Sequence, residues 1–151
     1  VWGLDGIAAM PLRPGSPSPL MSNTPPLLLM GALLAATATR ALVAVNAVIV
    51  ILGGALVWVF GGFAVHIGAS GLVFGWFGFL CARGLVDRSP ITLGAALVVG
   101  AVYGSLIWGV FPGQPGVSWE AHLFGALAGA VAAMVIPTNV HAPRIRNVER
   151  R

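Results

Sequence analysis

The sequence is dominated by five apolar runs, each about 15 to 21 residues long and bounded by Arg, Gly or Pro. A helix needs roughly 20 mostly apolar residues to cross the hydrocarbon core of a bilayer. Because lipid offers no water to backbone groups, helices are the expected form of such runs. We therefore predict an all-α, polytopic transmembrane helical bundle of about five spans, at 20–39, 41–60, 69–82, 91–111 and 117–136.

The composition agrees with a membrane protein and excludes a nucleic-acid-binding one. The chain of 151 residues is 58% hydrophobic and 8% charged, whereas soluble domains are roughly 45–50% apolar and about 25% charged. A net charge of +4 comes from eight basic residues, all of them Arg at run ends or in the terminal regions. A nucleic-acid site would gather such residues on one face. The predicted partner is the lipid bilayer, and no nucleic acid is expected.

The positions of the Arg residues predict the orientation. If all five runs cross, seven Arg lie on one side and only Arg13 lies on the other. The positive-inside rule makes the Arg-rich side cytoplasmic, so we predict an integral protein of the bacterial plasma membrane with a cytoplasmic C-terminus. The seven residues are Arg40, Arg83, Arg88, Arg144, Arg146, Arg150 and Arg151.

Three regions follow from this topology. Residues 1–19 form an extracytoplasmic loop or re-entrant segment, in which alternating prolines exclude a helix. Residues 20–137 form the transmembrane domain, and 138–151 form a basic cytoplasmic tail. Five crossings leave Val1 outside without a signal peptide. We therefore expect a further span before Val1 in the natural protein, or that the chain is a fragment.

Three polar residues, Asn23, Ser70 and His122, are predicted at the outer ends of spans. Polar groups at membrane depth are costly and tend to be functional. Ser70 lies between Gly68 and Gly71, which permit a sharp turn and a close approach of another chain. A serine hydroxyl needs a base to take its proton, and histidine suits that role near neutral pH.

The residues after His122 indicate close helix packing. Gly125 and Gly129 follow it by three and seven residues, so all three share one helix face. Small residues at this spacing let a neighbouring helix approach closely. If that neighbour begins at Ser70, His122 comes within hydrogen-bonding reach of the hydroxyl. Each feature alone is more typical of a turn or of plain packing, and the catalytic interpretation depends on their combination at one membrane face.

Other polar groups carry no comparable pattern. The three His residues are too scattered for a metal site. Cys81 is the single cysteine, so an internal disulfide is excluded. We expect neither a metal nor a cofactor. Glu120 lies two positions before His122, which on a helix turns its side chain away.

Two segments resemble a known family. Residues 66–75, HIGASGLVFG, resemble the GxSG segment that begins the serine-bearing helix of rhomboid intramembrane proteases. Residues 121–129, AHLFGALAG, resemble the rhomboid histidine helix, AHxxGxxxG. The resemblance extends from about Leu4 to Ile136. It implies a rhomboid-like fold, with the five runs matching the second to sixth helices of a six-helix core.

The resemblance also implies an activity. Ser70 and His122 would form a catalytic dyad without a third carboxylate, in a serine endopeptidase that cleaves transmembrane-helix substrates. Asn23 and the Ser70 backbone N–H would bind the oxyanion, and Gly68, Gly71, Gly125 and Gly129 would pack the helices.

The sequence departs from the family pattern at two positions. Rhomboids carry HxxxN where this chain has Pro19 before Asn23, and Pro14 replaces an earlier histidine. Loss of one oxyanion donor typically lowers a rate by about 10²–10³, so we expect impaired activity.

Two other functions remain open at this stage. A rhomboid-like pseudoprotease would bind membrane-protein clients without cleaving them. An unrelated transporter or channel subunit would need polar residues inside its spans, and these are scarce. We expect transmembrane proteins as substrates or clients and assign no oligomeric state.

Overall fold

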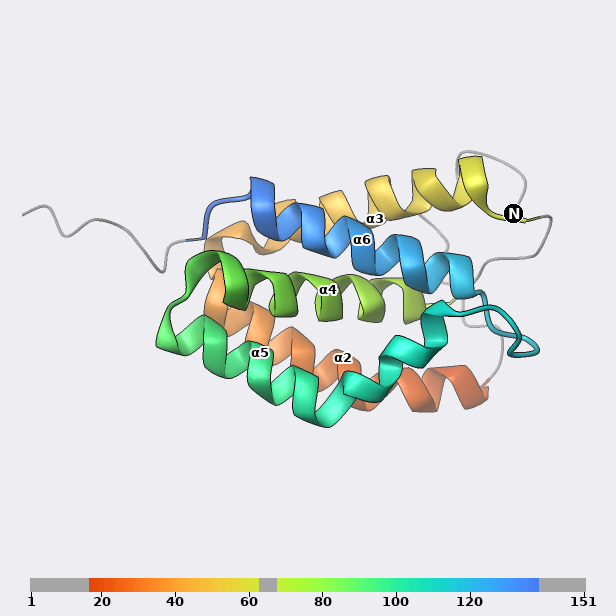
Figure 1. The fold of residues 1–151 in the computed structure, drawn as a ribbon, viewed down its shortest axis with the longest axis horizontal. Helices are drawn as coiled ribbons and strands as arrows, with labels where there is room; N and C mark the ends of the chain where they lie inside the picture. Colours follow the sequence, from red (N-terminus) through yellow and green to blue (C-terminus); the bar gives the residue numbers. More distant parts are fainter. Residues whose placement is uncertain (1–16, 63–67, 139–151) are drawn as a thin grey trace, which may run out of the picture.

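A computed structural model describes residues 17–62 and 68–138, with the backbone alone for residues 17–20, and all regular structure in these ranges is helical (Figure 1). The predicted all-α helical bundle is confirmed for these residues. In chain order the elements are α2 (Pro17–Ala38), the 3-10 helix η2 (Thr39–Ala41), α3 (Leu42–Phe60), α4 (Ser70–Asp87), α5 (Pro90–Tyr103), the 3-10 helix η3 (Gly104–Val110) and α6 (Trp119–Val135).

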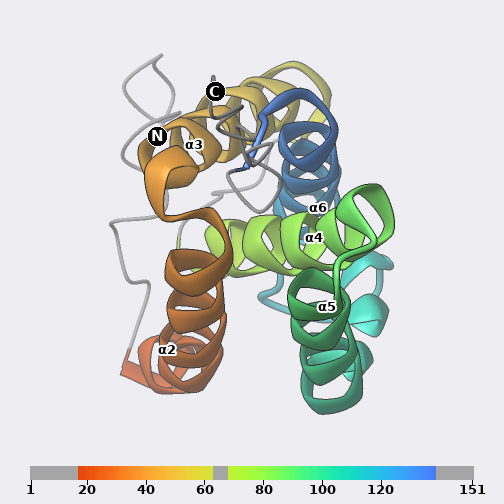
Figure 2. The same ribbon diagram turned by 90° about the vertical axis from the view of Figure 1, so that its left-hand side faces the viewer.

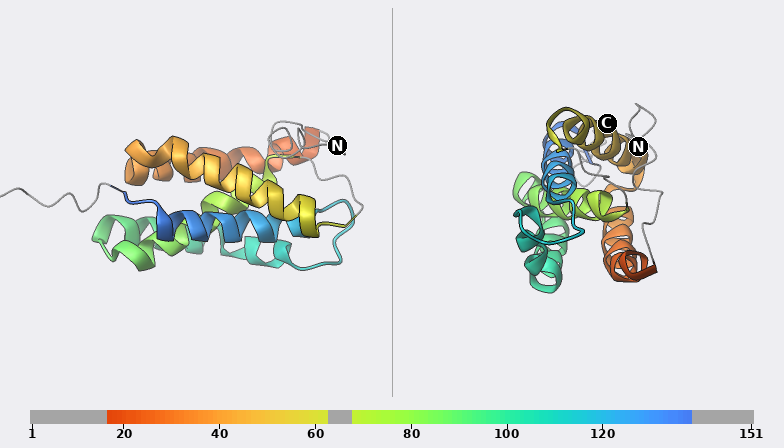
Figure 3. Two further views of the ribbon diagram at one scale, coloured as in Figure 1. Left: turned by 90° about the horizontal axis from the view of Figure 1, so that it is seen from above. Right: turned by 90° about the vertical axis from the view of Figure 1, so that its right-hand side faces the viewer.

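The helices run along the long axis of the molecule in alternating directions (Figure 1). As a result, the beginnings of α2, α4 and α6 and the ends of α3 and η3 all lie at one end of the bundle. Seen along that axis, α4 lies in the middle, with α3 and α6 on one side and α2 and α5 on the other (Figures 2 and 3).

Two segments are long and apolar enough to cross a membrane, Met21–Phe60 with 40 residues and Pro90–Val110 with 21. The first contains α2 and α3 joined through η2, and α6 is a shorter apolar helix. Large hydrophobic side chains cover the outer faces of α3 and α5, including Val43 and Leu97. Exposed apolar surfaces of this kind can mark a membrane contact, where lipid tails cover them. The protein is an integral membrane protein, and the number of crossings stays a prediction.

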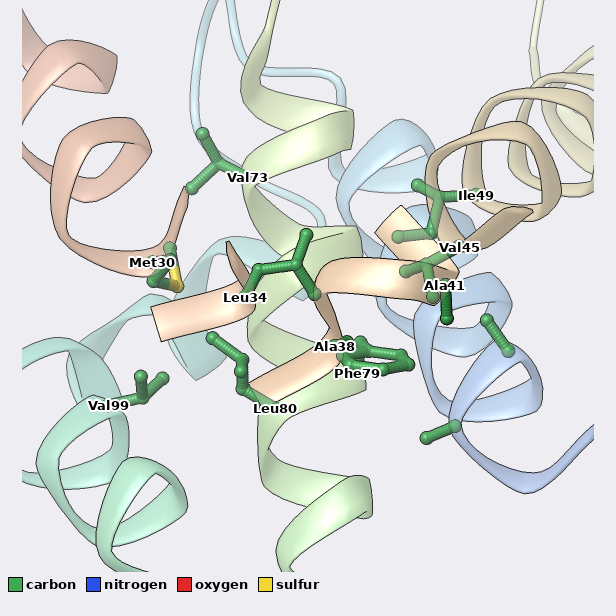
Figure 4. Packing of buried hydrophobic residues seen from close by; sticks show 12 residues of the cluster. Met30, Leu34, Ala38, Ala41, Val45, Ile49, Val73, Phe79, Leu80 and Val99 are labelled. Atoms are coloured by element: carbon green, nitrogen blue, oxygen red, sulfur yellow. The ribbon is translucent and has the colours of Figure 1, made fainter. Parts of the chain in front are cut away.

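The buried core joins α2 and α5 to the central helix (Figure 4). Met30 and Leu34 of α2 are almost fully buried, as is Val99 of α5. They pack in one cluster with Val73 and Leu80 of α4. This packing fixes α4, and therefore its first residue Ser70, relative to the outer helices.

Backbone contact between glycines joins α4 to α6. A Cβ at Gly125 would overlap the carbonyl oxygen of Gly71, and one at Gly129 would overlap that of Gly75. Only hydrogen side chains allow this approach, as in other membrane helix pairs with small residues at their interface. The two contacts are one helical turn apart on both helices, which fixes the register of the pair.

Gly68 has a different role from the helix packing that we expected. Among the described residues, a Cβ at this position would meet nothing within 4 Å, so none of the described helices packs closely against Gly68. Its φ of +112° lies in a region that side chains disfavour. The glycine therefore serves the turn that leads into α4.

Arg83 does not lie in a loop, although the sequence suggested that the third run ends at Ala82. Helix α4 continues to Asp87, and Arg83 is 6% exposed. Its guanidinium pairs with the Asp87 carboxylate at 2.6 Å and donates to the carbonyl oxygens of Ala133 and Ile136 at 2.7 and 2.9 Å. Arg83 thus ties the end of α4 to the end of α6.

The prediction that prolines exclude a helix up to Pro19 is wrong for its last residues, because α2 begins at Pro17. Proline is tolerated in a first helical turn, where N–H groups have no intrahelical partner. Pro25 and Pro26 lie further inside α2. Residues 1–16, 63–67 and 139–151, which include Pro14, His66 and the basic tail, lie outside the described residues.

Candidate active site

Ser70 is the first residue of α4. The preceding residue, Ala69, has no side chain that could cap the helix, and no side-chain cap bond is present there. The first N–H groups of a helix have no intrahelical acceptor. The start of α4 therefore presents uncapped N–H donors beside a partly buried Ser70.

His122 lies in the first turn of α6. The helix is capped by Ser118, whose Oγ accepts a hydrogen bond from the N–H of Ala121 at 3.2 Å. This cap fixes where α6 begins and so directs the His122 side chain into the bundle. The residue is 8% exposed.

Two contacts hold the His122 ring. Its Nδ1 lies 2.9 Å from the carbonyl oxygen of Gly109 in η3. The ring also stacks on Phe74, with ring centroids 3.9 Å apart and planes 6° from parallel. A carbonyl oxygen can only accept, so Nδ1 carries the proton and Nε2 of the neutral ring carries the lone pair. The ring is thus oriented with Nε2 available as a base.

The α4–α6 contact brings Ser70 and His122 to the same end of the helix pair. Gly71, the next residue after Ser70, touches Gly125, which is one turn beyond His122. Phe74, one turn beyond Ser70, stacks on His122. In the described part of the chain, no hydrogen bond joins the Ser70 hydroxyl to the His122 ring.

The other candidate residues are less closely tied to this pair. Asn23 is partly buried in the second turn of α2, at the same end of the bundle, and no hydrogen bond joins its amide to Ser70 or His122 within the described ranges. Glu120 lies toward the end of α3, since a Cβ at Gly62 would be 3.6 Å from its Oε1. Within residues 17–62 and 68–138, no three His, Cys, Asp or Glu side chains form a metal-binding group.

Comparison with known proteins decides the family. A model of the Rhomboid domain matches residues 11–139. The chain belongs to the rhomboid family. No solved structure matches this rhomboid chain significantly.

Related sequences come from mycobacteria. Uncharacterised proteins of Mycobacterium bovis and Mycobacterium tuberculosis are 43% identical over 143 residues, which is 89% of this rhomboid chain and 60% of each relative. One from Mycobacterium leprae is 39% identical over 140 residues, which is 87% of this chain and 55% of the relative. The chain therefore spans less than two thirds of the length of these relatives.

Two residues that hold the His122 ring were not identified from the sequence. Phe74 lies inside the segment that resembles the family, and its spacing of four from Ser70 places both on one helix face. That spacing was a usable signal. No sequence signal pointed to Gly109, because its contact with His122 joins two elements across a loop.

Proposed function

We propose that this rhomboid is an intramembrane serine endopeptidase that cleaves transmembrane-helix substrates with Ser70 and His122. The observation that carries the proposal is the fixed His122 ring. Its Nδ1 donates to Gly109, which leaves Nε2 as the basic nitrogen. The ring is buried at the end of the α4–α6 pair where Ser70 begins its helix.

In the first step, Ser70 Oγ attacks the carbonyl carbon of a substrate peptide bond while His122 Nε2 takes the hydroxyl proton. The tetrahedral intermediate collapses as the C–N bond breaks, and His122 returns the proton to the leaving amine. A water then attacks the acyl-enzyme with His122 again as base. This releases the acid and restores Ser70, as in other Ser–His hydrolases.

Uncapped N–H donors at the start of α4 support oxyanion binding in this scheme. The N–H of Ser70 is one donor, since it has no intrahelical acceptor. Asn23, at the same end of the bundle, is the second. Pro19 cannot supply the donor that the family's histidine would add, and one such donor is worth about 10²–10³ in rate. We therefore propose a slow enzyme.

The charge distribution supports an extracytoplasmic site. Arg40 in η2 and Arg88 after α4 are both exposed at the end of the bundle opposite to Ser70. Cytoplasmic ends of membrane proteins are enriched in Arg. We propose that this end, with the basic tail that follows α6, faces the cytoplasm of a bacterial cell.

A pseudoprotease that binds transmembrane clients is the second candidate. It is favoured by Pro19 and by the lack of a Ser70–His122 hydrogen bond among the described residues. It predicts binding of a membrane-protein client without loss of the client's peptide bond.

Cleavage in liposomes separates the two functions. The full-length protein is reconstituted with a fluorogenic transmembrane substrate, alone and as Ser70→Ala, with Ser105→Ala of η3 as the matched control. A protease produces a signal in the wild type and in the control but not in Ser70→Ala. Equal signals from wild type and Ser70→Ala would rule out the protease.

A further inference from the structure

We infer that Gly109 is a positioning residue of the proposed catalytic group: its carbonyl selects the tautomer of His122, and its missing side chain makes room for the ring. The inference rests on the proposed function only for its effect on rate. The contact itself places a proton on Nδ1 of His122, and the position of that proton can be observed without any substrate.

The end of η3 supplies an acceptor that needs a partner. The last carbonyl groups of a helix have no intrahelical N–H to accept from. In η3 the oxygen of Trp108 accepts from the N–H of Phe111, whereas the oxygen of Gly109 accepts from His122 Nδ1 at 2.9 Å. The ring N–H of His122 therefore satisfies a free carbonyl oxygen at the end of η3. The same hydrogen bond holds the His122 ring in place.

The 3-10 form of η3 directs Gly109 toward the bundle. A 3-10 helix has three residues per turn, so residues three apart lie on the same face. Leu106 packs against the buried core, and Gly109 follows it by three. Ile107 and Trp108 between them are exposed. This periodicity places the Gly109 backbone beside α4 and α6.

The neighbours of the Gly109 Cα favour glycine at this position. A Cβ on residue 109 would lie 2.8 Å from Cζ of Phe74 and 3.1 Å from Nδ1 of His122. The first distance forces a shift, and the second presses on the atom that donates the hydrogen bond. A Cβ on Gly104, the first residue of the same 3-10 helix, would meet nothing within 4 Å. Substitution of Gly104 is therefore a matched control for substitution of Gly109.

The carbonyl also suits the charge that the reaction creates. When His122 takes the Ser70 proton, the ring becomes a cation. The C-terminal end of a helix carries partial negative charge on its free carbonyl groups. Gly109 thus occupies the place that a carboxylate holds in a Ser–His–Asp triad, where the third group fixes the tautomer and stabilises the imidazolium.

The test records the His122 tautomer by 15N NMR of histidine-labelled protein in detergent micelles. Within this sequence, His66→Gln and His141→Gln leave His122 as the one labelled ring. In the wild-type background we expect the proton on Nδ1. In Gly109→Ala we expect a mixture with the Nε2-protonated form, and in Gly104→Ala the wild-type spectrum. A wild-type ring protonated on Nε2 overturns the inference, whether or not Gly109→Ala folds.

Kinetics in liposomes supply the second readout. We expect Gly109→Ala to lower kcat by about 10²-fold, the cost of misplacing a catalytic group by about 1 Å, with KM changed less than about twofold. Gly104→Ala should retain wild-type kcat. If Gly109→Ala loses activity while the ring keeps its Nδ1 proton, the positioning role is wrong. A wild type without Ser70-dependent cleavage contradicts the proposed function instead, and the tautomer spectrum still decides the inference.

Discussion

Pro19 and Asn23 are separated by one turn of α2, so a donor at position 19 would share a helix face with the Asn23 amide. The backbone at position 19 is already helical. Any side chain there is therefore directed by the same helix that carries Asn23. This geometry gives a test of the slow rate that we propose.

Restoring histidine at position 19 should raise activity. We expect Pro19→His to increase kcat by about 10²-fold, since one oxyanion donor is worth about 10²–10³. The measurement is cleavage of the fluorogenic transmembrane substrate, with Pro19→Gln as the control for removing the proline alone. Equal kcat for Pro19→His and the wild type would show that position 19 does not contact the oxyanion.

At the scale of single residues, the sequence was informative where a local pattern determined the position of a residue in its helix. The place of Ser70 at the start of a helix could be predicted from the glycine before it, and the close packing beside His122 from Gly125 and Gly129 on the same helix face. Their catalytic roles stay predictions. The Gly109 contact could not be predicted, because it depends on how η3 ends and on where α6 begins.

At the scale of elements, Arg83 joins the ends of α4 and α6: it forms a buried ion pair with Asp87 within α4 and donates hydrogen bonds to carbonyl oxygens at the end of α6. Arg83 and Asp87 are 7% and 8% exposed at their side chains. Asp87 Oδ2 also accepts a hydrogen bond from Thr138 at 3.1 Å. The spacing of four between Arg83 and Asp87 was visible in the sequence and is typical of a helical ion pair. The carbonyl groups that accept from Arg83 at the end of α6 could not be predicted from the sequence, because they are about 50 residues away in the chain.

Removing Arg83 should destabilise the fold strongly. Arg83→Ala leaves the Asp87 carboxylate buried without its partner, which typically costs about 3–5 kcal/mol. The measurement is the free energy of unfolding in detergent micelles titrated with SDS. The exposed Arg88 is the control, and Arg88→Ala should unfold like the wild type. If the two variants unfold alike, the Arg83 contacts do not stabilise the helix ends.

The glycines at the α4–α6 contact give a second prediction for elements. Gly129→Ala should lower the free energy of unfolding, since its Cβ would overlap the Gly75 carbonyl oxygen. Gly100→Ala in α5 should leave stability unchanged or raise it by up to about 1 kcal/mol, because its Cβ meets nothing within 4 Å. The same SDS titration checks both. A stable Gly129→Ala protein would mean that the helices do not touch as described.

At the scale of the whole molecule, the alternating helix directions follow from apolar runs joined by short turns. The central place of α4 could not be predicted in this way, because runs that are apolar on all sides do not reveal which helix the others surround. Glycines distinguish α4 in hindsight: Gly75 and Gly78 have no room for a side chain. The orientation in the membrane rests on the Arg residues alone.

Labelling from outside the cell tests that orientation. In a Cys81→Ser background, Gln114→Cys lies in the exposed loop at the Ser70 end, and Arg88→Cys lies at the other end. We expect a membrane-impermeant maleimide to label Gln114→Cys in intact cells, and Arg88→Cys only after permeabilisation. The reverse pattern would place Ser70 toward the cytoplasm.

The central claim is that His122 activates Ser70, and a covalent serine probe tests it most directly. The full-length protein is incubated with a fluorophosphonate, and the adduct is measured by intact mass and located by peptide mapping. We expect one adduct, on Ser70 of the wild type, with none on Ser70→Ala and at least about tenfold slower labelling of His122→Ala. Wild-type protein that stays unlabelled, or that reacts as fast without His122, would contradict the account.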